Sequence, residues 1–278
     1  MCGRYTLTAD LKKVADRFGA PMPEGEGISK KSEGKSDRGE GSEGEYEVWR
    51  PRYNIAPTQA VIVVGDDGKR YMKLMRWGLI PAWAKDASIG NKLINARAET
   101  LAEKPAFRNA LKKRRCIIPA DGFYEWPTLG RLKGMVQPPP QLHALLNSVL
   151  YIPMLNPKKI EAKIKQPVRV VLKSREPFGF AGLWEHWTSR DGEEILSCTI
   201  ITTAANELLR DVHERMPVIL TRDAEAAWLD PKTEDTAALL ALLKQYPADE
   251  MEFYPVSRDV NSPAIDKPGN IEPIKAGG

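Results

Sequence analysis

The sequence predicts an α+β fold, a single domain built on a curled, barrel-like and mainly antiparallel sheet with helices on its flanks. Short apolar segments of strand type recur along most of the chain, whereas helical patterns are few and short. The two kinds of element do not alternate as they do in βαβ units. With 278 residues, of which 42% are hydrophobic, the chain can bury a sizeable core. We expect residues 1–278 to form one domain.

The first expected elements are a helix and a hairpin. Apolar residues recur at helical spacing from Leu11 to Phe18, between a capping residue, Thr8, and a stop, Gly19. Residues 60–65 and 70–77 are strand-like and flank the turn at Asp66-Asp67-Gly68. The spacing therefore predicts a short amphipathic helix followed later by a β-hairpin.

The later elements follow from the same two periodicities. Strands are expected at Arg115 to Pro119, Val168 to Lys173, Phe180 to Trp184, Ile195 to Thr202, Val218 to Leu220 and Phe253 to Ser257. Helices are expected at Ala98 to Lys113, Asn206 to Val212, Ala224 to Leu229 and Glu234 to Gln245, the last two behind the capping residues Asp223 and Thr233.

Two stretches interrupt this pattern. Residues 24–47 hold eight acidic and four basic side chains, six glycines and four serines, so they bury too little apolar surface to offset the cost of ordering. We expect a disordered acidic Gly/Ser loop there. Residues 128–164 contain Pro138-Pro139-Pro140 and an apolar patch without a clear period, which indicates an irregular insertion.

Charge and cysteine content narrow the class of protein. Because the 24–47 loop carries −4 of a net charge of +4, the rest of the chain carries +8, which is compatible with a nucleic-acid partner. The cysteines Cys2, Cys116 and Cys198 lack C-x-x-C spacing, which argues against a disulfide scaffold or a zinc site. Cys116 and Cys198 lie in apolar strands and are expected in the core.

No stretch reaches the roughly 18 apolar residues of a membrane span, and no basic segment followed by an apolar core begins the chain. We expect a protein without membrane contact, located in the cytoplasm and associated with the nucleoid, or in the nucleus of a eukaryote.

Cys2 is the most informative candidate for chemistry. Removal of Met1 would place an amine and a thiol on neighbouring atoms of one residue. The amine can form a Schiff base with an aldehyde, and the thiol can then close a thiazolidine ring. Taken alone, a cysteine at position 2 is more often an accident of the start codon.

Three further polar residues lie in segments that a packed core would not select. Asn95 belongs to a segment expected to open a helix, where a capping role is the simpler alternative. Glu125 lies among aromatic residues, where an apolar pocket would raise its pKa and suit acid–base catalysis, although it could equally face solvent. His213 has the side chain best suited to proton transfer at neutral pH, or is a loop histidine without a role.

Trp77 ends an expected strand and begins the segment Trp77-Gly78-Leu79-Ile80-Pro81-Ala82-Trp83. An exposed ring there, flanked by Arg4, Arg76 and Arg97, would suit single-stranded DNA, because bases stack on rings while cations follow phosphates. The alternative is an ordinary core tryptophan.

Eight short segments follow one another in a characteristic order: Met1 to Tyr5, Arg52 to Gln59, Trp77 to Trp83, Asn95 to Glu99, Pro119 to Trp126, Ala181 to Glu185, Thr202 to Asn206 and His213 to Pro217. In order and in sequence these segments resemble the SOS-response-associated peptidase family, whose members shield abasic sites in single-stranded DNA. The chain departs from the family pattern in the 24–47 loop, in the insertion after Trp126-Pro127, and at Val168, where the family usually has an aromatic residue.

The resemblance implies a covalent DNA–protein crosslink between mature Cys2 and the aldehyde of a ring-opened abasic deoxyribose. Cys2 would be the nucleophile, Asn95 would position the sugar and the Cys2 amine, and Glu125 would act as acid and base. His213 would assist proton transfer and hold a phosphate or sugar on the 3′ side.

The resemblance also assigns DNA contacts. The residues expected to contact the backbone are Arg4, Arg97 and Thr202, and those expected to wedge or stack at the lesion are Trp77, Trp126 and Pro57. No metal or organic cofactor is expected, and we expect a monomer whose partner is single-stranded DNA with abasic sites.

Two other functions remain open. Cys2 and His213 could serve a cysteine peptidase that acts on other proteins. Alternatively, the basic surface and the tryptophans could form a module that binds single-stranded nucleic acid without catalysis. The expected enzyme is an abasic-site-processing protein with an N-terminal cysteine and peptidase-like or lyase-like chemistry.

Overall fold

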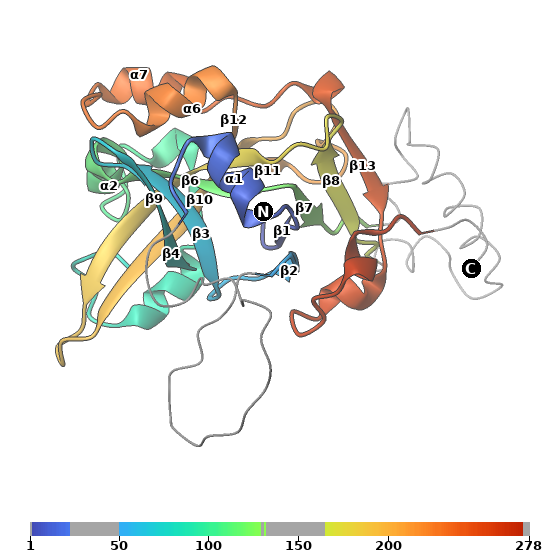
Figure 1. Cartoon of the computed structure of the whole chain (residues 1–278), viewed down its shortest axis with the longest axis horizontal. Helices are drawn as coiled ribbons and strands as arrows, with labels where there is room; N and C mark the ends of the chain where they lie inside the picture. Colours follow the sequence, from blue (N-terminus) through green and yellow to red (C-terminus); the bar gives the residue numbers. More distant parts are fainter. Residues whose placement is uncertain (1, 23–49, 129–130, 132–164, 275–278) are drawn as a thin grey trace, which may run out of the picture.

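The computed structural model describes residues 2–22, 50–128, 131 and 165–274 (Figure 1). The loop predicted at 24–47 lies outside the described residues, as does the insertion predicted at 128–164 apart from Thr128 and Arg131. No helix in the described ranges combines the length and the apolar character needed to cross a membrane.

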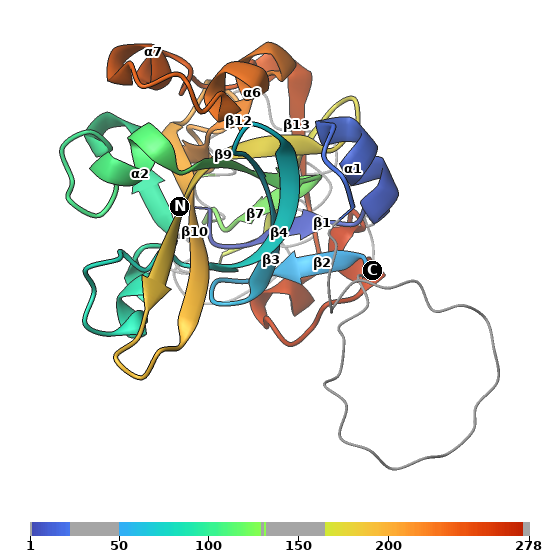
Figure 2. The same cartoon turned by 60° about the vertical axis from the view of Figure 1, so that its left-hand side comes forward.

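The centre of the fold is a closed barrel of five strands, which curl around a common interior (Figure 2). The strands are β3 (Ala60–Asp66), β4 (Arg70–Trp77), β6 (Arg115–Ala120), β9 (Phe178–Thr188) and β10 (Glu194–Ala204). Antiparallel pairing runs from β4 through β3, β6 and β9 to β10, and a parallel pairing of β10 with β4 closes the ring. This architecture confirms the predicted α+β fold with a barrel-like, mainly antiparallel sheet.

A second sheet brings the amino terminus to the site described below. Its order is β13 (Met251–Pro255), β8 (Val168–Leu172), β7 (Gly122–Glu125), β1 (Tyr5–Leu7) and β2 (Arg52–Ile55), with every pair antiparallel. Because β1 pairs directly with β7, the residues that precede β1 run alongside the end of β7.

Three short strands extend the barrel sheet. Along β10, β5 (Asn95–Arg97) pairs in parallel and β11 (Arg215–Pro217) pairs antiparallel, while β12 (Ile219–Leu220) pairs with β9. Strand β10 therefore places the segment that begins with Asn95 near the segment that follows His213.

The helices cover the outside of the sheets. Within the described ranges the α-helices include α1 (Leu11–Phe18), α2 (Arg108–Lys113), α6 (Arg222–Leu229) and α7 (Thr236–Ala241), and α6 and α7 lie together at the top of Figure 1. Short 3₁₀ helices are η1 (Ala87–Lys92), η2 (Ala98–Thr100), η3 (Ala248–Glu250), η4 (Arg258–Asn261) and η5 (Pro268–Ile271).

Helix α1 and the hairpin of β3 and β4 confirm the first predicted elements, with one change of cap. The side chain of Asp10, rather than Thr8, accepts a hydrogen bond from the helix, and Gly19 ends the helix with φ at 60°. That left-handed conformation favours glycine because other side chains clash there.

Other helix predictions were wrong in extent or type. The predicted helix at 98–113 is divided into η2 and α2, with Pro105 between them, a residue that has no N–H for a helical bond. Residues 206–212 form turns instead of a helix, and α6 and α7 are capped by Thr221 and Asp235. Asn95 lies in strand β5 and does not open a helix.

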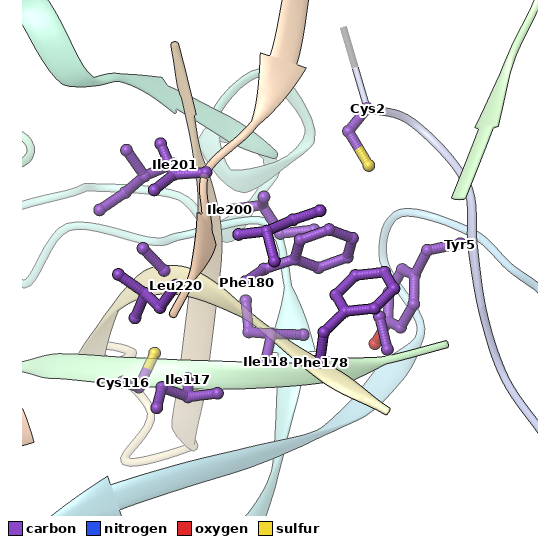
Figure 3. Close-up of a cluster of buried hydrophobic side chains, with 14 of the residues drawn as sticks. Cys2, Tyr5, Cys116, Ile117, Ile118, Phe178, Phe180, Ile200, Ile201 and Leu220 are labelled. Carbon is purple, nitrogen blue, oxygen red and sulfur yellow. The ribbon is translucent and has the colours of Figure 1, made fainter. Parts of the chain in front are cut away.

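The core fills the barrel and continues to Cys2. Apart from Cys2, the side chains labelled in Figure 3 come from β6, β9, β10, β12 and β1, and the sulfur of Cys2 points toward them from one end of the cluster. Tyr5 packs edge-on against Phe180, with ring centroids 5.8 Å apart. Cys116 and Cys198 are fully buried, as predicted, and both are free thiols.

Candidate active site around Cys2

Four predicted site residues converge from separate parts of the chain. Cys2 lies three residues before β1, and Glu125 ends β7, the neighbouring strand. Asn95 begins β5, and His213 lies two residues before β11; both of these strands pair with β10. The pairing of β1 with β7 and the pairing of β5 and β11 with β10 together assemble the site.

Asn95 holds the main chain of Cys2. Its side-chain Nδ2 donates a hydrogen bond of 2.9 Å to the carbonyl oxygen of Cys2. The Asn95 Oδ1 atom is also buried and has no hydrogen-bond partner among the described residues. A buried amide oxygen of this kind is ready to accept a hydrogen bond from a ligand or from a nearby N–H group.

The Cys2 thiol is buried and neutral at physiological pH. The residue is 0% exposed, and Sγ donates to the carbonyl oxygen of Arg4 over 4.0 Å. Burial raises the pKa of the thiol well above its ordinary range, and the negative charge of Glu125 raises it further. The thiol therefore needs a base before it can act as a nucleophile.

Glu125 is buried close enough to Cys2 for its charge to affect the pKa of the thiol. It is 5% exposed, so the alternative of a carboxylate facing solvent is wrong. Burial raises the pKa of Glu125 to about 7, against the opposing effect of the positive charge at the amino terminus. Near neutral pH the carboxyl group is therefore present in both forms and can either donate or accept a proton.

His213 is half-buried and held in one orientation. Its Nδ1 accepts a hydrogen bond of 2.9 Å from the main-chain N–H of Arg215. Burial lowers the pKa of His213, and the positive charge at the amino terminus lowers it further. The neutral ring with its proton on Nε2 is thus the dominant form above neutral pH.

Arg4 and Trp126 are fixed by the C-terminal part of the chain. Arg4 Nη1 donates to Asn54 Oδ1 at 2.8 Å and to the carbonyl of Val260 at 2.7 Å, and Nη2 donates to the carbonyl of Asn261 at 3.3 Å. Trp126 Nε1 donates to Asn261 Oδ1 at 2.7 Å, and its ring lies 5.9 Å from the Arg4 guanidinium. Much of the hydrogen-bonding capacity of Arg4 is therefore used within the protein.

The structure corrects two predicted DNA contacts. Trp77 is 0% exposed, donates from Nε1 to the carbonyl of Ile94 at 2.9 Å and packs against Tyr5, so its ring is core and is not available to a base. Thr202 is also buried, with its hydroxyl accepting from Arg215 at 3.3 Å. Both side chains are therefore part of the packed interior in this structure.

The exposed aromatic residue of the Trp77 segment is Trp83. Trp83 is 61% exposed. Of the other residues predicted to contact DNA, Arg97 is also exposed and Pro57 is half-buried. Trp187 donates from Nε1 to the carbonyl of Ala84 at 2.8 Å, which holds the loop that carries Trp83 against β9. Trp83 was missed although it lies in the same motif as Trp77.

Asn54 is a second residue that the sequence did not reveal. It is fully buried, and its Nδ2 atom donates to the carbonyls of Val260, Ser262 and Ile265. The same side chain accepts from Arg4, so it joins β2 to the C-terminal segment beside Trp126. The sequence feature that could have drawn attention to Asn54 is its position in the Arg52 to Gln59 motif.

Among the residues that the structure places, no group of three or more His, Cys, Asp or Glu side chains is arranged to hold a metal ion.

Comparison with known proteins gives a consistent result. The model of the SOS response associated peptidase (SRAP) family matches residues 1–144 and 156–263. The abasic site processing protein YoqW of Bacillus subtilis is 42% identical over 275 residues, covering 98% of this chain and 99% of YoqW. The abasic site processing protein HMCES of Gallus gallus is 33% identical over 250 residues, covering 84% of this chain and 69% of HMCES.

Solved structures share the fold. A crystal structure of a protein from Bacteroides thetaiotaomicron superimposes with a TM-score of 0.72 at 25% identity, covering 99% of this chain and all of that one. A second, from Bordetella bronchiseptica, gives a TM-score of 0.62 at 25% identity and covers 92% of this chain and all of that one.

Proposed function

The chain belongs to the SOS response associated peptidase family, and from this we propose that it recognises abasic sites in DNA and captures them covalently through Cys2. Relatives that match nearly its whole length are named abasic site processing proteins. The observation that carries the proposal is the position of Cys2, bonded to Asn95 and within the electrostatic influence of buried Glu125. We propose single-stranded DNA as the substrate and a monomer as the active form.

The proposed reaction has two bond-forming stages after Met1 is removed. The Cys2 amine adds to the C1′ aldehyde of a ring-opened abasic deoxyribose, and loss of the hydroxyl as water gives an imine. The Sγ–H bond then breaks, sulfur bonds to C1′, and the nitrogen gains a proton, which closes a thiazolidine ring. One water molecule is released for each crosslink.

Glu125 would serve both stages. Its protonated form donates to the leaving hydroxyl, and the carboxylate that remains accepts the proton of the Cys2 thiol. A carboxyl with a pKa of about 7 suits both transfers near neutral pH. The raised pKa of the Cys2 thiol makes this base necessary, because the free thiolate is scarce.

Asn95 and His213 would orient the reactants. The buried Oδ1 of Asn95 can accept a hydrogen bond from the Cys2 amine or the sugar, while its Nδ2 keeps the Cys2 carbonyl in place. The Nε2–H group of His213 can donate to a phosphate or to the sugar on the 3′ side. Both roles use neutral donors and acceptors, which leave the proton transfers to Glu125.

The DNA strand would contact exposed cationic and aromatic side chains around this centre. Arg97 is exposed and can pair with phosphate, and the rings of Trp83 and Trp126 can stack on bases. Pro57 is half-buried and can act as a wedge beside the lesion. Arg4 would mainly hold Trp126 in place, and its remaining N–H donors would contact the DNA backbone.

A protein-directed cysteine peptidase is the less favoured alternative. Such enzymes use a thiolate with a lowered pKa, whereas burial raises the pKa of Cys2. The amine of Cys2 is needed only for aldehyde capture. Peptide hydrolysis that survives acetylation of this amine would therefore favour the peptidase.

The test compares wild type with Cys2→Ala on single-stranded DNA that contains one abasic site. We expect wild-type protein to remain attached to DNA on a denaturing gel and Cys2→Ala to lose this attachment completely. Equal retention by the two proteins, or none by wild type, would contradict the proposal. A module that only binds nucleic acid would show no attachment in either protein.

A further inference from the structure

A bidentate ion pair connects the segment that carries Asn95 with the segment that carries His213. Arg215 donates from Nη1 to Glu99 Oε1 at 2.7 Å and from Nη2 to Glu99 Oε2 at 2.9 Å. Its Nη2 also donates to the main-chain carbonyl of Thr202 at 2.6 Å. These bonds use both arms of the guanidinium, a geometry that fixes direction as well as distance.

The ion pair spans strand β10. On one side, Arg97 of β5 is in register with Thr202, and Glu99 follows two residues later in η2. On the other side, Arg215 of β11 is in register with Ala204. The Arg215 side chain is 14% exposed and that of Glu99 is 50% exposed, so the pair is only partly screened by solvent.

Arg215 also contacts the His213 ring, through its main chain. Its N–H donates to Nδ1 of His213, so a neutral ring carries its proton on Nε2. The other tautomer would place a proton on Nδ1, directly against this N–H group. The position of the Arg215 main chain therefore selects the form of the imidazole.

We propose that Glu99 and Arg215 are positioning residues whose ion pair fixes the Arg215 main chain and thereby holds His213 as the Nε2–H tautomer. The consequence for DNA capture rests on the proposed function, since Nε2–H is the group that His213 offers to the lesion. Breaking the pair should release the ring and slow capture, while most of the DNA-binding surface stays intact.

The test uses Glu99→Gln with Glu252→Gln as a matched control. Glu252 pairs with Arg175 on the other sheet, and both of those side chains are about half exposed. Nitrogen-15 NMR of the histidine side chains, assigned with His213→Gln, reports which ring nitrogen carries the proton. We expect Glu99→Gln to lose the single Nε2–H form and Glu252→Gln to keep it.

Kinetics give the second measurement, on abasic single-stranded DNA. We expect crosslinking by Glu99→Gln to be about tenfold slower, with DNA affinity within about twofold of wild type. Arg215→Lys keeps a cation but loses the fork, so its rate should lie between those of the wild type and Glu99→Gln.

An unchanged tautomer and rate in Glu99→Gln would overturn the proposal, as would equal losses of rate and affinity. Thermal melting identifies a variant that has lost its fold, in which case Arg215→Lys decides the question by the same two measurements. The NMR result needs no DNA. A wild-type protein that forms no crosslink would contradict the proposed function instead.

Discussion

Asn95 and Cys2 lie 93 positions apart in the sequence and are joined by a hydrogen bond of 2.9 Å from the Asn95 side chain to the Cys2 carbonyl. The bond fixes the main chain of Cys2 from a strand on the other sheet, without engaging the Cys2 amine or thiol. It therefore restrains the residue while leaving both reactive groups of Cys2 to the proposed chemistry.

Glu125→Gln should slow crosslinking far more than it weakens DNA binding. Glutamine keeps the size of the side chain but cannot donate or accept the protons of imine formation and ring closure, a loss worth about 10²-fold or more. Single-turnover rates and equilibrium binding to the same abasic strand measure the two effects separately. Equal losses in rate and affinity would count against an acid–base role.

The same substitution should stabilise the folded protein at alkaline pH. Burial raises the pKa of Glu125 from 4.5 to about 7, so the folded state holds this proton more tightly than the unfolded chain does. The associated stability is present below pH 4.5 and is lost as pH rises toward and through 7. We expect Glu125→Gln to exceed wild type at pH 8 by up to about 3 kcal/mol in the free energy of unfolding.

Urea unfolding at pH 5 and pH 8 measures this difference. The advantage of Glu125→Gln should be larger at pH 8, because wild type must then bury a carboxylate. An advantage that is the same at both pH values would show that Glu125 does not titrate between them.

Cys2→Ser should keep the amine and lose the stable ring. A serine hydroxyl adds to an imine far less effectively than a thiol, so capture would stop at the Schiff base. Borohydride, which reduces imines, should trap a covalent product with Cys2→Ser. Without it, the adduct should be lost on a denaturing gel. A stable adduct without reduction would argue against the thiazolidine.

Trp83→Ala should weaken DNA binding, because a base loses its stacking partner at a cost of about 1–3 kcal/mol. Leu74→Ala is a suitable control, since Leu74 is 40% exposed on β4 and is apolar but not aromatic. Fluorescence anisotropy with labelled single-stranded DNA compares the two variants. Equal affinity of Trp83→Ala and wild type would remove Trp83 from the interface.

Local sequence patterns predicted much of the fold. The hairpin of β3 and β4, the stop of α1 at Gly19 and the burial of Cys116 follow from alternation, helical spacing and apolar runs that involve neighbouring residues. The short strands β5 and β11 could not be predicted in this way. Each has three residues and exists because it pairs with β10, which comes from a distant part of the chain.

Sequence motifs identified the candidate site residues, but they did not predict how buried each residue is or which side chains it contacts. Trp77 is 0% exposed and Trp83 is 61% exposed, although the sequence presents the two tryptophans in one segment. Alternation in β4 held a partial signal, since Trp77 shares the inward face with Met75, two residues earlier. The pairings of Glu99 with Arg215 and of Asn54 with the C-terminal segment required the tertiary fold.

The most direct test of the central claim is the intact mass of the protein after incubation with an abasic single strand. We expect the product to weigh as much as protein without Met1 plus the DNA strand, less one water, with peptide fragmentation placing the DNA on Cys2. An unmodified protein mass, or an adduct on any residue other than Cys2, would contradict the account.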